Sequence, residues 1–116
     1  MIVSESFVVA DWTARRGAKG HRVTGLHRHL ADDEAWIVLE GRLGFEVDGL
    51  QSEVPAGESM LVERGTPHTW WNAQDEPTRY LLVMTPRIHS LIEALHQSEA
   101  SDFARIFAEH ESELLE

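Results

Sequence analysis

The stretch from residue 26 to residue 41, LHRHLADDEAWIVLEG, is the feature that most restricts how this chain can fold. His27 and His29 are two positions apart, so on a β-strand their side chains point to the same face. A bend over residues 31–33 would bring Glu34 back to the same place. Two imidazoles and one carboxylate in this arrangement indicate a metal site, whose fourth ligand has to come from elsewhere in the chain.

A second stretch, residues 57–72, holds a single histidine. His68 follows a turn predicted around Gly65 and Pro67, at the beginning of another strand-like segment. The period of two along a strand places Trp70 on the same face as His68. A tryptophan at this position fits either the wall of a pocket or plain core.

Together the two stretches resemble the two motifs of the cupin superfamily. The first motif reads HxH, three or four residues, Glu, six residues, Gly, and it is filled by His27, His29, Glu34 and Gly41. The second motif is matched by Gly57, Gly65, His68 and Asn72. The chain departs from the pattern at Glu63, where the family has proline, and at His21, where it has glycine. Both departures fall in turns and neither affects a ligand position.

The resemblance implies an all-β fold, the antiparallel double-stranded β-helix or cupin jelly-roll barrel. It also implies a three-histidine, one-glutamate centre for one divalent transition metal, with ligands His27, His29, Glu34 and His68. Iron, manganese, nickel, cobalt, copper and zinc all suit such nitrogen and oxygen ligands. The alternative is that these four side chains line the barrel and hydrogen-bond one another without a metal.

Four protein ligands leave one or two coordination positions open, which is typical of catalytic sites. In its single-barrel build the chain most resembles the quercetin-dioxygenase-like cupins, which predicts a small-molecule oxidoreductase of dioxygenase type. Glu34 could then also act as general base. Trp36, on the same strand face as Glu34, and Trp70 are the predicted substrate pocket. The alternatives are a non-redox isomerase or lyase, and a barrel that binds a ligand without turnover.

Apolar and β-branched residues, which alternate loosely over residues 2–12 and regularly over 42–47, predict a first strand at 2–12 and further strands at 21–30, 34–40, 42–47, 50–54, 58–63, 68–72 and 78–85. Gly41 marks a turn with positive φ, and Asp48-Gly49 indicates a type I′ hairpin. The predicted loop over residues 13–20 carries Arg15, Arg16 and Lys19. Together with Arg22, just after the loop, they form a basic cluster. Residues 78–85 are apolar on both faces, so we expect their outer face to be covered by C-terminal helices or by a second subunit.

At Thr85-Pro86 the pattern changes from strand to helix, with threonine as N-cap and proline at the first helical position. We therefore divide the chain into a barrel, residues 1–86, and C-terminal helices, residues 87–116, that pack on the barrel or on a partner. A second helix is predicted from about Ser101, with one apolar stripe formed by Phe103, Ile106, Phe107, His110 and Leu114.

The chain has 116 residues, enough for one domain with one core, and a formal net charge of −10. This charge argues against binding to nucleic acid or to an anionic membrane. The absence of cysteine leaves a metal site to nitrogen and oxygen ligands. Neither a signal peptide nor a membrane span is predicted, so we expect a cytoplasmic protein. The substrate that we expect for the predicted metal site is a small molecule. The family resemblance further implies a homodimer.

Overall fold

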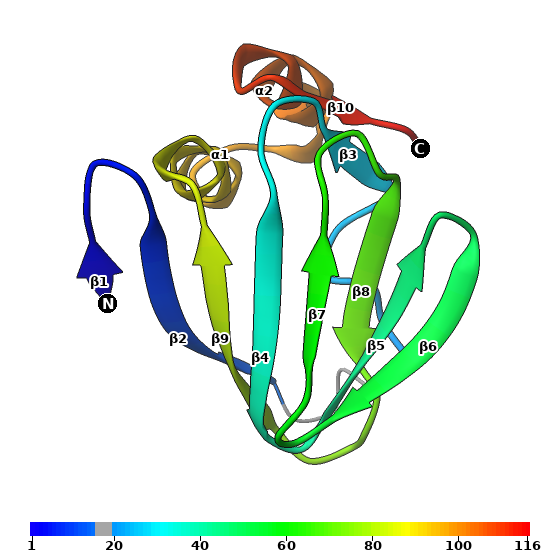
Figure 1. Cartoon of the computed structure of the whole chain (residues 1–116). Coiled ribbons are helices and arrows are strands. Elements are labelled where there is room, and N and C mark those ends of the chain that lie inside the picture. Colours follow the sequence, from blue (N-terminus) through cyan, green and yellow to red (C-terminus); the bar gives the residue numbers. More distant parts are fainter. Residues whose placement is uncertain (16–19) are drawn as a thin grey trace.

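The described residues, 1–15 and 20–116 of this computed structural model, form two facing five-stranded antiparallel sheets with helices across one end (Figure 1). The sheet orders are β1-β2-β9-β4-β7 and β10-β3-β8-β5-β6. The strands are β1 (Ile2–Val3), β2 (Val8–Ala14), β3 (His27–His29), β4 (Glu34–Glu40), β5 (Arg42–Val47), β6 (Leu50–Pro55), β7 (Ser59–Val62), β8 (His68–Asn72), β9 (Thr78–Met84) and β10 (Ser112–Leu114). The predicted antiparallel double-stranded β-helix with a helical extension is confirmed.

The N-terminal segment is a hairpin rather than the single strand predicted for residues 2–12. β1 pairs antiparallel with β2, so that Ile2 lies opposite Val9. The turn between them is held by Ser4, whose Oγ accepts hydrogen bonds from the backbone N–H groups of Ser6 (3.2 Å) and Phe7 (3.0 Å). Such local serine bonds compete with strand pairing, and alternation of apolar residues does not reveal them.

The strand predicted for residues 21–30 is shorter than expected, because only β3 has regular strand geometry. The residues before it follow β8 irregularly, with an isolated bridge between Arg22 and Trp71. Of the predicted basic cluster, Arg16 and Lys19 lie outside the described residues. Arg22 is paired with Glu46, at 3.8 Å, and with Glu116.

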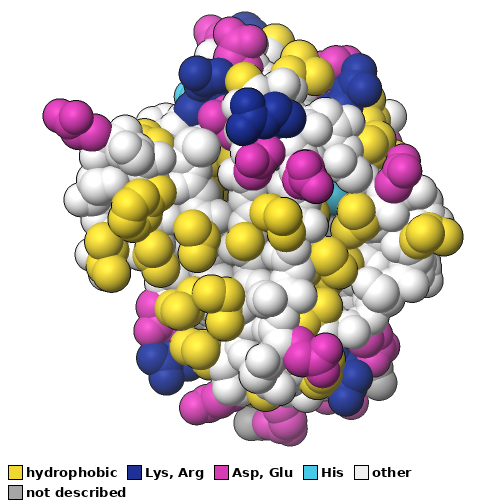
Figure 2. Space-filling view, in the orientation of Figure 1, with side chains coloured by type: hydrophobic (Ala, Val, Ile, Leu, Met, Phe, Trp, Pro, Cys, Tyr) yellow, Lys and Arg dark blue, Asp and Glu magenta, His cyan; other side chains and the backbone are white. Residues whose placement is uncertain are grey.

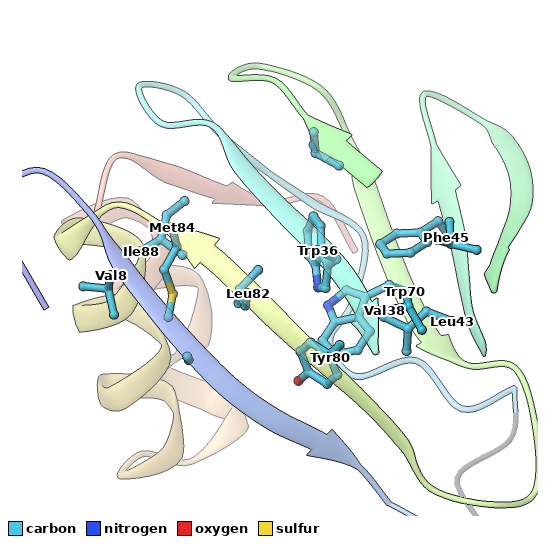
Figure 3. Packing of buried hydrophobic residues seen from close by; sticks show 13 residues of the cluster. Val8, Trp36, Val38, Leu43, Phe45, Trp70, Tyr80, Leu82, Met84 and Ile88 are labelled. Atoms are coloured by element: carbon cyan, nitrogen blue, oxygen red, sulfur yellow. The ribbon is translucent and has the colours of Figure 1, made fainter. Parts of the chain in front are cut away.

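Aromatic and aliphatic side chains from both sheets fill the space between them (Figure 3). The sequence of β9 did not show which of its two apolar faces points into the barrel. The inward face carries Tyr80, Leu82 and Met84, all buried. These pack in one cluster with Trp36 from the neighbouring strand β4 and Phe45 from β5 of the facing sheet. The core therefore lies inside the barrel, around the same faces that carry the predicted site.

The outer face of the β1-β2-β9-β4-β7 sheet is also apolar. Figure 2 shows hydrophobic side chains gathered over this sheet, and the exposed ones are Ile2, Val3, Phe7, Ile37, Leu39 and Leu61. The C-terminal helices lie across one end of the barrel instead of over this face (Figure 1). That a second copy covers it stays a prediction.

Helix α1 (Pro86–His96) begins as predicted. Thr85 is its N-cap, and its Oγ1 accepts a hydrogen bond from the backbone N–H of Ile88 at 3.2 Å. The buried side chain of Ile88 joins the core of the barrel, whereas that of Leu91 packs in a second cluster with Ile106 and Phe107. None of the helices in the described part of the chain is long and apolar enough to cross a membrane.

The second helix ends earlier than predicted. After a short 3-10 turn (Ala100–Asp102), α2 (Phe103–Glu109) stops before the expected stripe reaches Leu114. The chain reverses at Glu111, which has φ +53°, and enters β10, where Ser112 pairs with His29 and Leu114 with His27. Extending a helix to Leu114 was wrong because pairing with the free edge of β3 prevails over helical spacing, which is a weak local preference.

Two predicted turns are confirmed. Asp48 and Gly49 both have positive φ, +52° and +81°, as a type I′ hairpin between β5 and β6 requires. Gly41, between β4 and β5, has φ +91°. A Cβ at Gly41 would lie 2.6 Å from Nε2 of Gln74 and 3.1 Å from Cα of Thr78. This turn therefore needs glycine for its backbone and for its packing.

Gly41→Ala and Gly57→Ala form a matched pair that separates these two requirements. Gly57 has nearly the same φ, +89°, but a Cβ there would meet nothing within 4 Å. We expect both variants to lose roughly 1 kcal/mol or more for the strained φ, and Gly41→Ala to lose about 1–3 kcal/mol in addition for overpacking. Urea unfolding followed by circular dichroism measures both losses. Equal losses would show that the contact with Thr78 and Gln74 does not matter.

Candidate metal centre

The four predicted ligands come together inside the barrel. His27 and His29 lie on β3, Glu34 on β4 and His68 on β8, so the two sheets both contribute. All four side chains are buried, and one potential ligand atom from each lies within 4.8 Å of the others. These residues form a cluster that could hold a metal ion.

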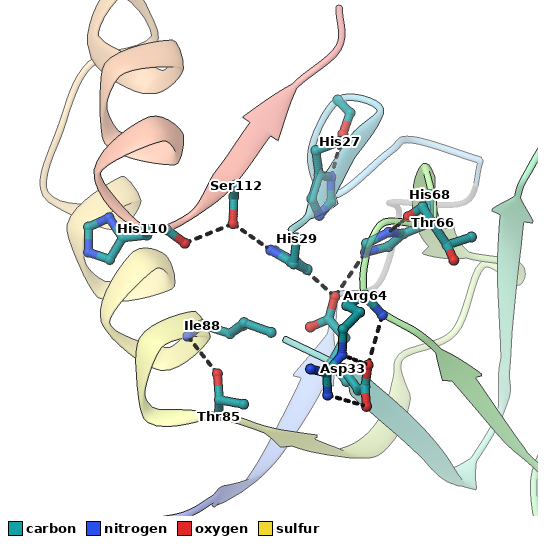
Figure 4. A network of polar contacts seen from close by, with 12 residues as sticks. His27, His29, Asp33, Arg64, Thr66, His68, Thr85, Ile88, His110 and Ser112 are labelled. Carbon is teal, nitrogen blue, oxygen red and sulfur yellow. Dashed lines mark hydrogen bonds and ion pairs between the residues drawn. The ribbon is translucent and has the colours of Figure 1, made fainter. Parts of the chain in front are cut away.

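Backbone carbonyls fix the orientation of two of the imidazole rings (Figure 4). Nδ1 of His27 lies 2.8 Å from the carbonyl oxygen of Gly25, and Nδ1 of His68 lies 2.9 Å from that of Thr66. A carbonyl can only accept, so Nδ1 carries the proton in both rings. In the neutral ring the lone pair is then on Nε2, the atom that a metal would bind.

The third ring is fixed by a residue of the C-terminal strand. Nδ1 of His29 lies 2.8 Å from Oγ of Ser112, and this hydroxyl donates to the carbonyl oxygen of His110 at 3.0 Å. Because the hydroxyl proton is used there, Ser112 accepts the Nδ1 proton of His29. No sequence pattern indicated Ser112, since its place beside His29 depends on the pairing of β10 with β3.

The carboxylate of Glu34 faces the Nε2 atoms. Its Oε1 lies 3.0 Å from Nε2 of His29 and 2.8 Å from Nε2 of His68. If both rings are neutral, the lone pairs of their Nε2 atoms point at Oε1 of Glu34. A cation bound between these three atoms would interact favourably with each of them. Ligands at right angles around a metal with bonds of about 2.1 Å are roughly 3 Å apart. The two separations from Glu34 therefore match those of ligands around one divalent transition metal, whereas a metal-free network would need a proton on Nε2 of both rings as well.

In the metal-free protein the electrostatics of the cluster keep Glu34 ionised and His27 neutral, which are two of the protonation states that a metal requires. Burial acts to raise the pKa of Glu34. The hydrogen bonds that His29 and His68 donate, and the positive charge of these rings when protonated, outweigh burial and lower this pKa to about 2. Burial, followed by the neighbouring His68 and His29, lowers the pKa of His27 to about 3. At neutral pH Glu34 is thus ionised and His27 is neutral.

A cavity of about 670 Å³ adjoins the cluster. Its lining includes His27, His29 and Glu34 together with both predicted pocket residues, Trp36 and Trp70. Sequence reasoning missed the helical part of the wall. The side chains that α1 and α2 contribute are Ile88, Leu91, Ile92, Leu95, His96, Phe103 and Phe107. The ring of Phe107 packs edge-on against that of His27, with 5.3 Å between centroids.

Comparison with known proteins gives a consistent result. The model of the cupin domain family matches residues 17–84, more than half of the chain. An uncharacterized protein of Methanocaldococcus jannaschii is 32% identical over 63 residues, which are 54% of this chain and 50% of that relative. The chain thus matches half the length of this curated relative.

Solved structures with the same architecture include a conserved double-stranded β-helix protein of Klebsiella pneumoniae. It has a TM-score of 0.62 and 23% identity, over 74% of this chain and 68% of that one. A sugar phosphate isomerase of the cupin superfamily from Silicibacter pomeroyi has a TM-score of 0.59 and 27% identity, over 69% of this chain and 50% of that one. The likeness to the Klebsiella protein concerns the fold alone.

Ser112→Ala tests whether the C-terminal strand supports the cluster. Removing the hydroxyl leaves the ring of His29 without its acceptor, so we expect Zn²⁺ or Co²⁺ to bind about 10- to 100-fold more weakly. Competition with a chromophoric chelator measures this affinity. Ser112→Thr keeps the hydroxyl and should retain most of it. Equal affinities of wild type and Ser112→Ala would contradict the role of Ser112.

The lowered pKa of His27 predicts how the metal-free protein responds to acid. Below pH 6.5, the usual value, the unfolded chain binds a proton at His27 that the folded chain does not bind until about pH 3. Stability should therefore be unaffected above pH 6.5 and fall by up to about 1.4 kcal/mol per pH unit below it. Glu34, whose pKa is also lowered, adds a loss below its usual 4.5.

Urea unfolding between pH 7.5 and 4.5 measures this slope. His27→Gln cannot titrate, so it should flatten the slope over this range, while its stability at pH 7.5 provides the reference. A slope that is identical in the variant would show that His27 is not the group responsible.

Proposed function

Because the chain belongs to the cupin domain family, we propose that it is a mononuclear metal-dependent oxidoreductase of dioxygenase type. Its substrate would be a small apolar or aromatic molecule. The observation that carries the proposal is the position of the cluster, whose His27, His29 and Glu34 line a largely apolar cavity large enough for such a molecule.

The four clustered side chains have distinct roles in this proposal. His27, His29 and His68 would hold the metal through Nε2, while Glu34 would bind through Oε1, the atom that faces His29 and His68. Oε2 of Glu34 would then be available to accept a proton from a substrate hydroxyl in the cavity. A redox-active metal here would supply electron exchange with O₂ and Lewis acidity toward the substrate.

The wall of the cavity favours an apolar substrate. Tryptophan rings and the aliphatic and phenyl side chains of the helical region form much of the lining of the space beside the cluster. A phosphate group would call for several unpaired cations. Two arginines line the cavity in the described part of the chain, Arg15 and Arg22, and Arg22 is already paired with Glu46 and Glu116, which leaves Arg15 alone for such a group.

A non-redox isomerase or lyase is the second candidate, and the 27% identity to the Silicibacter pomeroyi isomerase supports it. The same cluster would then polarise a carbonyl group, and Glu34 would move a proton between carbon atoms. The identity of the bound metal, and whether turnover requires O₂, distinguish the two candidates.

Elemental analysis of the untagged protein is the first test. We expect close to one equivalent of a transition metal in the wild type, and its loss in a His27→Ala/His68→Ala variant that circular dichroism shows to be folded. Absence of metal even after reconstitution would overturn both enzyme proposals and leave a ligand-binding barrel.

Oxygen uptake with phenols and enediols is the second test, with an anaerobic reaction as control. The proposal expects turnover that stops without O₂ and falls about 100-fold or more in Glu34→Gln, the loss typical of a missing general base. Turnover that continues anaerobically would favour the isomerase or lyase. Metal binding without any turnover would favour a binding protein.

A further inference from the structure

Three polar groups beside the metal cluster have no hydrogen-bond partner among the described residues. They are the indole N–H of Trp36, the indole N–H of Trp70 and the hydroxyl of Tyr80. The Trp36 side chain is only 1% exposed, and its Nε1 is buried and unpaired. Of the three, only the Trp36 nitrogen is a fully buried atom without a partner, and because buried indole N–H groups nearly always have one, its position calls for an explanation.

These three side chains adjoin one another and line the same cavity. The ring centroids of Trp36 and Trp70 are 5.9 Å apart, and those of Trp70 and Tyr80 are 5.2 Å apart. In Figure 3 the nitrogen edge of Trp36 points toward Trp70 and Tyr80. The ring of Trp36 is also 6.0 Å from that of His68, which places this group of donors next to the predicted ligands.

The donors are neutral, and the nearest buried charge is negative. Burial and then the charge of Glu34 raise the pKa of Tyr80, so its hydroxyl keeps its proton and can donate. An anionic oxygen bound there would be repelled by Glu34 and would find no cation among the three side chains. A neutral oxygen acceptor, such as a ketone carbonyl, avoids this cost.

We propose that Trp36, Trp70 and Tyr80 form a donor subsite for the neutral carbonyl oxygen of an aromatic or planar substrate. This inference rests on the proposed function and specifies its substrate class. The substrate's ring would lie between the tryptophan side chains and the apolar wall from the helices, and its other end would face His27, His29 and Glu34. Trp36 and Trp70, the predicted pocket residues, would thereby each offer an indole N–H to the substrate as well as an aromatic ring that lines the cavity.

Acetophenone and ethylbenzene are suitable probes, because they have similar size and differ in the carbonyl oxygen. Benzoate provides the anionic counterpart. Each is titrated into ¹⁵N-labelled protein, both metal-free and loaded with Zn²⁺, while the indole N–H signals are followed by NMR. Trp12→Phe, Trp70→Phe and Trp71→Phe variants assign the Trp36 signal by elimination, so the test does not depend on a Trp36 variant.

We expect acetophenone to move the Trp36 indole proton downfield and to bind about three- to tenfold more tightly than ethylbenzene, the gain typical of one hydrogen bond. Trp36→Phe should abolish this preference while ethylbenzene still binds. Tyr80→Phe, which removes one donor and keeps the ring, should reduce it.

Equal binding of acetophenone and ethylbenzene, or an upfield shift that leaves the Trp36 N–H directed at the ring of Trp70, would overturn the proposal. So would tighter binding of benzoate, or the absence of binding by all three probes. Because the metal-free protein is tested too, a chain that binds acetophenone as expected but takes up no metal would refute the proposed function and leave the subsite standing.

Discussion

The buried carboxylate of Glu34 is the interaction on which the rest of the site depends. An ionised group in the core of a barrel is costly unless it has close partners. Oε1 of Glu34 lies 2.8 Å from Nε2 of His68 and 3.0 Å from Nε2 of His29, and these contacts are favourable only with a proton on each nitrogen or a cation between the atoms. Both partners present Nε2, because their Nδ1 protons are directed at acceptors on the opposite side of each ring. The barrel thus brings one carboxylate and three imidazole nitrogen atoms to one place, where all of them could coordinate a single cation.

The barrel achieves this by bringing together strands that are distant in sequence. β3 and β8 lie in one sheet and β4 lies in the other, and their inward faces meet between the sheets. The C-terminal segment adds to the arrangement from outside the two motifs. Its strand β10 extends the sheet beside β3 and places Ser112 behind His29, while Phe107 packs against His27. The helical region is therefore part of the site as well as a cover for the end of the barrel.

Much of the fold could be predicted because its signals are local. Alternation identified most strands, Asp48-Gly49 and Gly41 identified turns by their backbone requirements, and Thr85-Pro86 identified the beginning of α1. The failures have a common cause. The Ser4 turn, the short β3 and the strand β10 all depend on hydrogen bonds that spacing of apolar residues does not record. The assignment of enzyme class was not reachable in this way, since one ligand set serves several chemistries.

The sequence by itself determined which residues could form the cluster, because two histidines at alternate strand positions share a face and the motif offsets place Glu34 and His68 at strand starts. It also predicted that Trp36 and Trp70 share strand faces with Glu34 and His68, while for Trp70 it left open whether the ring belongs to a pocket wall or to the core. Only the tertiary structure decided which nitrogen each ring presents, which side chain supports His29, and that the donors of Trp36, Trp70 and Tyr80 meet unpaired in one cavity. Those features depend on contacts between residues far apart in the chain, and such contacts exist only once the two sheets and the C-terminal strand are packed.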